Sequence, residues 1–114
     1  MIKRTHTCGE LNKSNIGHEI HLNGWISKSR DLGGLIFIDL RDRYGKTQIV
    51  FNEENHINAF NTAKKLGLED VIGIKGVVVA RPEDAINKDI ATGEIDVEVN
   101  EISVYNESEP TPFD

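Results

Sequence analysis

Apolar and polar residues alternate in short segments along the first half of the chain, which is the pattern of strands that bury one face. Residues 20–30 alternate in this way, and Gly24 interrupts the pattern as a bulge or a sharp bend would. Residues 35–40 and 47–51 form two further runs that are rich in β-forming residues, and residues 41–46 between them have the polar composition of a hairpin loop. The pattern predicts a meander of three antiparallel strands.

A different spacing follows the third run. Between residues 53 and 66 the apolar side chains recur at every third position: Ile57, Phe60, Ala63 and Leu66. This spacing is typical of an amphipathic helix, and Asn52 and Gly67 stand where an N-cap and a terminating glycine belong. We therefore expect one helix after the three strands.

Strand patterns return in the second half of the chain. Residues 71–80 are rich in β-branched residues, and residues 94–105 alternate until the parity slips near Asn100, which indicates a bulge. Residues 81–93 form a long connection between these two runs. Three strands, a helix and two strands is the order of the OB fold, an all-β class with one helix: a five-stranded Greek-key barrel with the helix between strands three and four. Loops of that barrel bind oligonucleotides.

Size and composition narrow the class of protein. The 114 residues suffice for one domain with one small core. No run approaches the roughly 20 apolar residues that cross a bilayer, and the N-terminus has no signal-peptide stretch, so we expect a cytoplasmic protein without membrane contact. Cys8 is the single cysteine and no zinc-ligand spacing occurs, so we expect neither a disulfide framework nor a metal.

The charge is unevenly distributed. A net charge of −6 argues against a protein that coats nucleic acid without selectivity, because such binders are usually basic. Residues 1–30 nevertheless hold five basic and two acidic side chains, whereas residues 94–114 hold seven acidic and no basic ones. The sequence therefore leaves room for a local basic surface.

Phe37 is the most informative position for function. Its run places three apolar residues on the core face: Ile36, Ile38 and Leu40. Phe37 therefore points outward, where a ring can stack on a nucleobase with about 1–3 kcal/mol; the alternative is packing under the 81–93 connection. Gln48 shares this outer surface by parity and can donate to and accept from a base edge, unless it is a solvated strand residue.

Lys28 and Arg30 end the first run near the same surface. A guanidinium there can hydrogen-bond a base or a phosphate. Counted from Ile20, simple alternation places Arg30 on the core side, so this role requires a bulge near Gly24 or a strand that has already ended.

Arg81 and Asn87, on the long connection, could reach the same ligand, Arg81 through phosphate or base contacts and Asn87 through hydrogen bonds; solvated loop positions are the alternative. The carboxylates are scattered without a His or Ser partner, and we interpret them as solvated charges: Asp39, Asp42, Glu83, Asp84, Glu94 and Asp96. The sequence has no phosphate-binding glycine loop and no nucleophile motif. It predicts binding rather than catalysis.

Several of these stretches also occur in a known family. Residues 24–26 (Gly-Trp-Ile) and 30–48 (from Arg-Asp-Leu-Gly-Gly to Lys-Thr-Gln) closely resemble the N-terminal anticodon-binding domain of bacterial-type aspartyl-tRNA synthetases. Residues 87–97 resemble that family's entry to strand five, and residues 110–114 resemble its link to the catalytic domain. The resemblance implies an OB domain over residues 1–107 and, from 108 to 114, the start of a linker to a class II catalytic domain that lies outside this chain.

The resemblance also implies a ligand, the anticodon loop of aspartate tRNA with the anticodon GUC. Phe37 would stack on the central uridine, while Arg30 and Gln48 would hydrogen-bond its edge. Arg81 and Asn87 would address the third base or the adjacent backbone. The implied phosphate contacts are Lys28, Arg41 and Arg43.

Asp96 stands at the strand-five acidic position, which in the family accepts hydrogen bonds from the first-position guanine and is commonly Glu. Because Asp is one methylene shorter, a bridging water would replace a direct contact. Leu32 occupies a position where family members that also accept asparagine tRNA have His, which favours specificity for aspartate tRNA.

For the enzyme as a whole, the resemblance implies aspartylation of tRNA with ATP and Mg²⁺ in the catalytic domain, and a homodimeric parent. The isolated domain would be a monomer without a cofactor and without catalysis of its own. Two other interpretations stay open: the OB domain of a lysyl- or asparaginyl-tRNA synthetase, and a stand-alone OB module that binds single strands generally or another protein.

Overall fold

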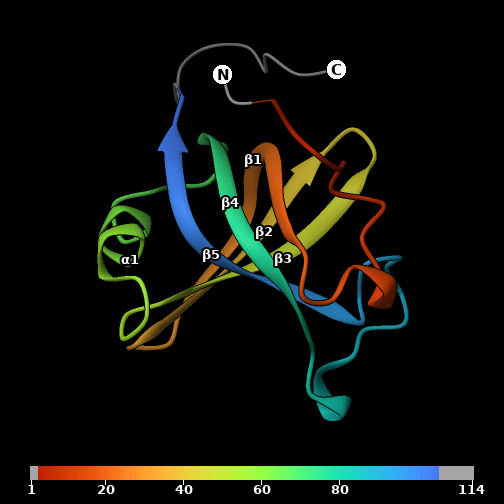
Figure 1. Ribbon diagram of the computed structural model, residues 1–114. Coiled ribbons are helices and arrows are strands. Elements are labelled where there is room, and N and C mark those ends of the chain that lie inside the picture. The colour runs from red at the N-terminus through yellow and green to blue at the C-terminus, as the bar shows by residue number, and fades with distance from the viewer. Residues whose placement is uncertain (1–2, 106–114) are drawn as a thin grey trace.

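The computed structural model describes residues 3–105 and contains a closed barrel (Figure 1). Its strands are β1 (Glu19–Asp31), β2 (Leu35–Asp42), β3 (Gly45–Asn52), β4 (Val71–Ala80) and β5 (Ile95–Val104). The helix α1 (Ile57–Ala63) follows β3, and two 3₁₀ turns cover Lys13–Asn15 and Glu83–Ala85. Around the barrel the order is β1-β2-β3-β5-β4, with β3 and β5 parallel and the other neighbours antiparallel. The predicted all-β OB fold, with the helix between strands three and four, is confirmed.

β1 bends because it pairs with two different strands. It pairs with β4 up to Trp25 and with β2 from Trp25 onward. Just before the change, a Cβ atom on Gly24 would lie 2.5 Å from the carbonyl oxygen of Arg41, so this close approach requires glycine. Gly24 therefore stands next to the position where β1 changes its pairing partner, whereas the bulge lies further along the strand, between Ile26 and Lys28.

The turn between β2 and β3 is tighter than the six-residue loop predicted for residues 41–46. Both strands extend into that range and leave Arg43 and Tyr44 as the turn. Asp42 makes this possible, because its carboxylate accepts the backbone N–H groups of Cys8, Tyr44 and Gly45 at 2.8, 2.8 and 3.1 Å. Asp42 is only 3% exposed, so its interpretation as a solvated charge is wrong.

The helix is shorter than the predicted 53–66. Its N-cap is His56, and the carboxamide oxygen of Asn52 accepts the N–H of Glu54 at 2.9 Å instead. Such an Asx turn competes with the helix for backbone donors and delays its start. At the other end, α1 stops at Ala63, well before Gly67.

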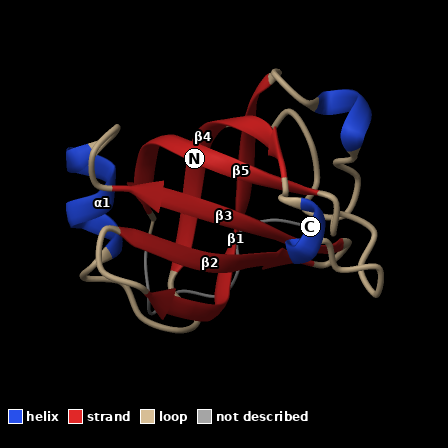
Figure 2. Cartoon of the chain, turned by 90° about the horizontal axis from the view of Figure 1, so that it is seen from below, coloured by secondary structure: helices blue, strands red, loops and turns tan. Residues whose placement is uncertain are grey.

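Most of the buried core residues come from the five strands of the barrel. The helix α1 lies at one end of the barrel, with the 81–93 connection at the other (Figure 2). The helix packs Ala59, Phe60 and Ala63 against the barrel residues. On β5 the predicted bulge is confirmed, since Glu101 pairs with Lys75 and Val99 with Gly76, so that the residue between them has no partner. No helix within residues 3–105 is long and apolar enough to span a membrane. The linker expected at residues 108–114 lies outside the described residues.

Candidate nucleic-acid interface

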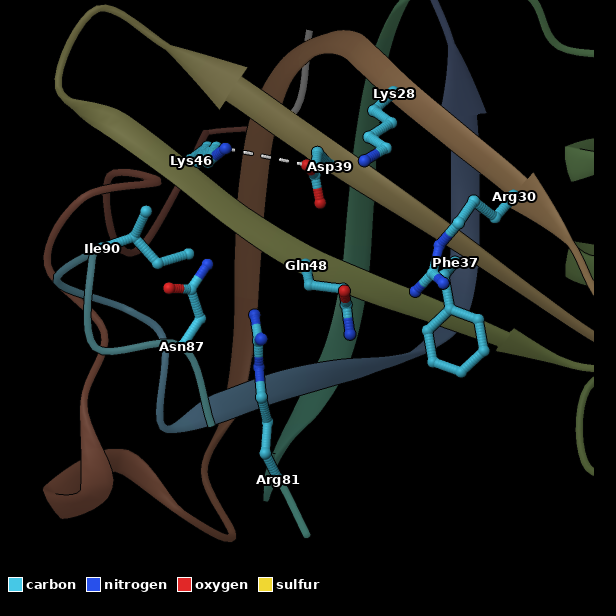
Figure 3. A pocket seen from close by; sticks show the side chains of 9 residues that line it. All are labelled: Lys28, Arg30, Phe37, Asp39, Lys46, Gln48, Arg81, Asn87 and Ile90. Carbon is cyan, nitrogen blue, oxygen red and sulfur yellow. Dashed lines mark ion pairs between the residues drawn. The ribbon is translucent and has the colours of Figure 1, made fainter. Parts of the chain in front are cut away.

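The outer face of β1, β2 and β3 carries a pocket of about 170 Å³, which we call the Phe37 pocket (Figure 3). Its lining residues are Lys28, Arg30, Phe37, Asp39, Lys46, Gln48, Arg81, Asn87 and Ile90. Five of the predicted base-binding residues and one predicted phosphate contact thus line one pocket. The strands and the 81–93 connection supply its walls, as the OB architecture predicts.

Phe37 lies on the outer face, as the parity of β2 predicts. Ile36 and Ile38, its neighbours in sequence, are 2% and 1% exposed and belong to the core. The guanidinium Cζ of Arg30 lies 5.4 Å from the centroid of the Phe37 ring, within cation–π range. The ring and the guanidinium therefore lie next to each other at the pocket (Figure 3).

The bulge in β1 is what places Arg30 beside the ring. Ile26 pairs with Leu40 and Lys28 with Asp39, so Ser27 is an extra residue in β1. One extra residue moves every following side chain to the opposite face. Arg30, which simple alternation assigns to the core, therefore pairs with Phe37 on the outer face. The required bulge exists, but near Ser27 rather than near Gly24.

A buried network forms the opposite wall. The Nε of Arg81 lies 2.9 Å from Oδ1 of Asp96, and the Nε2 of Gln48 donates to the same oxygen at 3.0 Å. The side chains of Arg81 and Asp96 are 7% and 11% exposed. Arg81 also donates to the backbone carbonyls of Ile95 and Ala85 at 3.1 and 3.2 Å. Arg81 is therefore an anchored residue and not a solvated loop position.

Asp96 differs most from its sequence interpretation. It is buried rather than solvated, and it does not line the pocket but lies against Arg81 and Gln48. Burial raises the pKa of its carboxyl, and this outweighs the attraction of Arg81 and the hydrogen bond from Gln48, which lower it. A carboxylate that is kept in a costly environment by a specific partner is a common feature of functional sites.

The charge of the pocket suits an anionic ligand. Four cationic side chains line it, those of Lys28, Arg30, Lys46 and Arg81, against the single carboxylate of Asp39. Asp39 lies 3.9 Å from the Nζ of Lys46. Three lining residues were not among the predicted site residues: Asp39, Lys46 and Ile90. The first two could have been found, because Asp39 shares the parity of Phe37 and Lys46 that of Gln48.

Hydrogen bonds within the 81–93 connection hold Asn87 in place. Its N–H donates to the carbonyl of Gly93 at 3.0 Å, and its side-chain oxygen accepts the N–H of Asp89 at 2.9 Å. A Cβ atom on Gly93 would meet the Asn87 carbonyl oxygen, so this loop closure requires glycine. The connection thus presents Asn87 to the pocket in a defined position.

Arg41 and Arg43 lie outside the Phe37 pocket, at the β2–β3 turn. Arg41 lines a neighbouring pocket of about 210 Å³, and the Cζ of Arg43 lies 5.7 Å from the centroid of the Tyr44 ring. The described residues 3–105 contain no group of His, Cys, Asp and Glu side chains that could hold a metal ion.

Known proteins share the sequence pattern and the fold of this chain. Residues 20–105 match the sequence model of a protein family, the OB-fold nucleic acid binding domain of the tRNA anticodon type. The chain belongs to this family. It is 52% identical over 113 residues to the aspartate–tRNA ligase of Listeria monocytogenes serotype 4a (strain HCC23), covering 99% of this chain and 19% of that protein. It is 46% identical over 112 residues to the aspartate–tRNA(Asp/Asn) ligase of Anaplasma marginale (strain Florida), covering 98% of this chain and 19% of the relative.

Solved structures show the same domain. The asparaginyl-tRNA synthetase from Pyrococcus horikoshii has a TM-score of 0.74 and 28% identity, and the match covers 91% of this chain and 23% of that one. The structure of OBody AM3L15 bound to hen egg-white lysozyme has a TM-score of 0.81 and 25% identity, and the match covers 99% of this chain and 98% of that one. The chain spans about a fifth of the length of the ligases that it matches. It corresponds to their N-terminal anticodon-binding domain.

Proposed function

We propose that this domain binds the anticodon loop of aspartate tRNA and that it serves an aspartate–tRNA ligase. The observation that carries the proposal is the Phe37 ring, which points out of the barrel into a cationic pocket and has the Arg30 guanidinium beside it. An aromatic ring with cations and amides around it is how single-stranded RNA loops are generally bound. The family of the chain supports the same ligand.

The central uridine of the anticodon is the base we assign to Phe37. Uracil presents carbonyl acceptors and one N–H donor. Arg30 can donate to a uracil carbonyl, and the amide oxygen of Gln48 can accept from the uracil N–H. Gln48 is oriented for this by its bond to Asp96, because that bond uses the amide nitrogen. Stacking provides affinity, and the two polar groups provide selectivity.

We assign the first and third anticodon bases to the wall of the pocket that Arg81, Asn87 and Asp96 form. We assign Arg81 and Asn87 to the third base or the adjacent backbone, since both line the pocket from the connection. Asp96 would meet the first-position guanine through a bridging water, because its Oδ1 already accepts from Arg81 and Gln48 and its side chain is 11% exposed. Lys28 and Lys46 at the rim would meet phosphates.

The wider assignments rest on the family alone. We infer that the domain needs no cofactor and is monomeric, and that ATP, Mg²⁺ and aspartylation belong to the catalytic domain of a homodimeric, cytoplasmic ligase. We further infer specificity for aspartate tRNA, since Leu32 stands where His accompanies acceptance of asparagine tRNA. Leu32 is 59% exposed at the turn that follows β1, so its side chain is accessible to an RNA loop.

Binding isotherms test the proposal. We compare a hairpin RNA whose loop carries GUC, the same hairpin with GAC, and a polypyrimidine strand. The GUC hairpin should bind about 1–3 kcal/mol more tightly than the GAC hairpin, because the wrong central base leaves polar groups of the pocket unpaired. Equal binding of all three would favour a general single-strand binder, and binding of none at low salt would favour a protein-interaction module.

A further inference from the structure

A second pocket adjoins the first. It measures about 210 Å³ and shares Lys46 and Ile90 with the Phe37 pocket. Arg41, Tyr44 and Thr92 complete its main walls, and we call it the Tyr44 pocket. Because two residues line both pockets, a ligand strand can pass from one into the other without leaving the protein surface.

Tyr44 is the most exposed aromatic residue in the described part of the chain. It is 52% exposed at the tip of the β2–β3 turn. The Cζ atoms of Arg4 and Arg43 lie 5.5 and 5.7 Å from the centroid of its ring, within cation–π range. An accessible ring among guanidinium groups combines a stacking surface with positive charge, as the Phe37 pocket does.

The frame around Tyr44 is tightly packed. A Cβ atom on Gly45 would lie 2.8 Å from Cα of Gly9, and one on Gly9 would clash with the carbonyl oxygen of Tyr44, so the N-terminal segment is in close backbone contact with the turn. The Thr92 hydroxyl donates to the Lys46 carbonyl and ties the 81–93 connection to β3. Three segments that are distant in sequence thus hold the pocket in one shape.

Nearby carboxylates do not cancel the positive charge. Asp42 is buried beneath the turn, and its oxygens accept three backbone N–H groups. Asp39 is on the side of the Phe37 pocket and lies near Lys46. The Tyr44 pocket therefore has Arg41 and Lys46 but no acidic side chain among its lining residues, and Arg4 and Arg43 lie beside the Tyr44 ring.

We propose that the Tyr44 pocket is a second nucleotide site for the RNA strand that occupies the Phe37 pocket. The ring of Tyr44 stacks on the base of a nucleotide that flanks the three anticodon bases, and Arg41 with Lys46 binds the phosphate between the two pockets. This inference rests on the proposed function. It adds a reason why an RNA loop would bind more tightly than its three anticodon bases alone.

The experiment measures affinities of the chain for two probes, the trinucleotide GUC and the GUC hairpin. Tyr44→Ala should weaken hairpin binding about 5- to 150-fold, the value of one stacked base, and change trinucleotide binding by less than about 2-fold. Tyr44→Phe, which keeps the ring, should bind both probes like the unmodified chain. Leu68→Ala, at an exposed apolar position, is the matched control and should change neither.

Arg41→Gln provides a second readout that does not depend on the ring. The logarithm of hairpin affinity falls with the logarithm of salt concentration. The steepness of this fall should decrease by about 1, because one phosphate contact is lost. The slope for the trinucleotide should stay the same. If Tyr44→Ala loses its fold, this variant decides the question.

Two results would overturn the second site. One is hairpin affinity that is unchanged in both Tyr44→Ala and Arg41→Gln; the other is an equal loss for both probes, which would make Tyr44 a support of the first pocket. Phe37→Ala separates the second nucleotide site from the proposed function, because it should weaken the binding of both the trinucleotide and the hairpin. If Phe37→Ala changes neither, the proposed function itself fails, whatever Tyr44 does.

Discussion

The two walls of the Phe37 pocket hold their side chains in different ways. On one wall, Phe37 and Arg30 form a cation–π contact, with 5.4 Å between the guanidinium carbon and the ring centroid. On the other wall, Arg81, Asp96 and Gln48 form a network of an ion pair and a hydrogen bond, and Arg81 and Asp96 are nearly buried. The first wall is held by a contact between a ring and a cation, whereas the second is held by an ion pair and hydrogen bonds.

This difference separates two parts of recognition. A ring that makes no hydrogen bonds stacks on any base and adds affinity. Polar groups that are fixed beforehand lose little conformational entropy on binding and reject a base that does not match them. The cost is the burial of a carboxylate whose pKa is raised in spite of its partners. Substitutions on the two walls should therefore act on different quantities.

Asp96→Ala should give the largest effect, on stability. It leaves the guanidinium of Arg81 nearly buried without its counter-charge, and breaking such a pair costs about 3–5 kcal/mol. Urea unfolding measures this loss. Asp39→Ala is the matched control, since its pair with Lys46 spans 3.9 Å at partly exposed side chains and contributes about 1 kcal/mol or less. Equal losses for the two variants would mean that the network is not a buried anchor.

Phe37→Ala and Ile38→Ala, adjacent in β2, should separate binding from stability. Ile38 is 1% exposed, and its truncation should lower the free energy of unfolding by about 2–5 kcal/mol. Phe37→Ala should leave the melting temperature nearly unchanged and weaken hairpin binding by about 1–3 kcal/mol. Thermal melts and binding isotherms on the same samples test this. A Phe37→Ala variant that unfolds would place the ring in the core and refute the outward assignment.

Arg30→Lys should have a smaller effect on binding. Lysine keeps the charge but loses the planar donor group that stacks on Phe37 and hydrogen-bonds a base edge. Hairpin affinity should fall by about 1 kcal/mol, while the salt dependence of binding stays the same. A reduced salt dependence would instead assign Arg30 to a phosphate.

The pH dependence that Asp96 contributes should be the smallest effect. Its pKa is raised in the folded state, so the folded chain holds this proton more tightly than the unfolded chain does. The stabilisation is full below the ordinary value of 3.8 and is lost as pH rises from there through the raised folded value. The free energy of unfolding of the unmodified chain minus that of Asp96→Asn should therefore fall with rising pH across this window. A rise would mean that Arg81 outweighs the burial of Asp96.

Several features of the fold and of the pocket could be predicted from the sequence alone. Strand alternation has a period of two residues, and this local rule placed Phe37 and Gln48 on the outer face and the bulge on β5 at Asn100. The order of strands and helix then identified the barrel. These features need no knowledge of which strands lie side by side.

Tertiary structure decided the rest, because pairing register joins residues that are distant along the chain. The face on which Arg30 lies depends on one extra residue, Ser27, that only the pairing with β2 reveals. The contact of Arg81 with Asp96 depends on how β4 and β5 pair, and burial by that pairing is what turns an apparently solvated carboxylate into an anchor. Arg41 belongs to the second pocket for the same reason, since the N-terminal segment and the 81–93 connection meet at the β2–β3 turn only in the folded barrel.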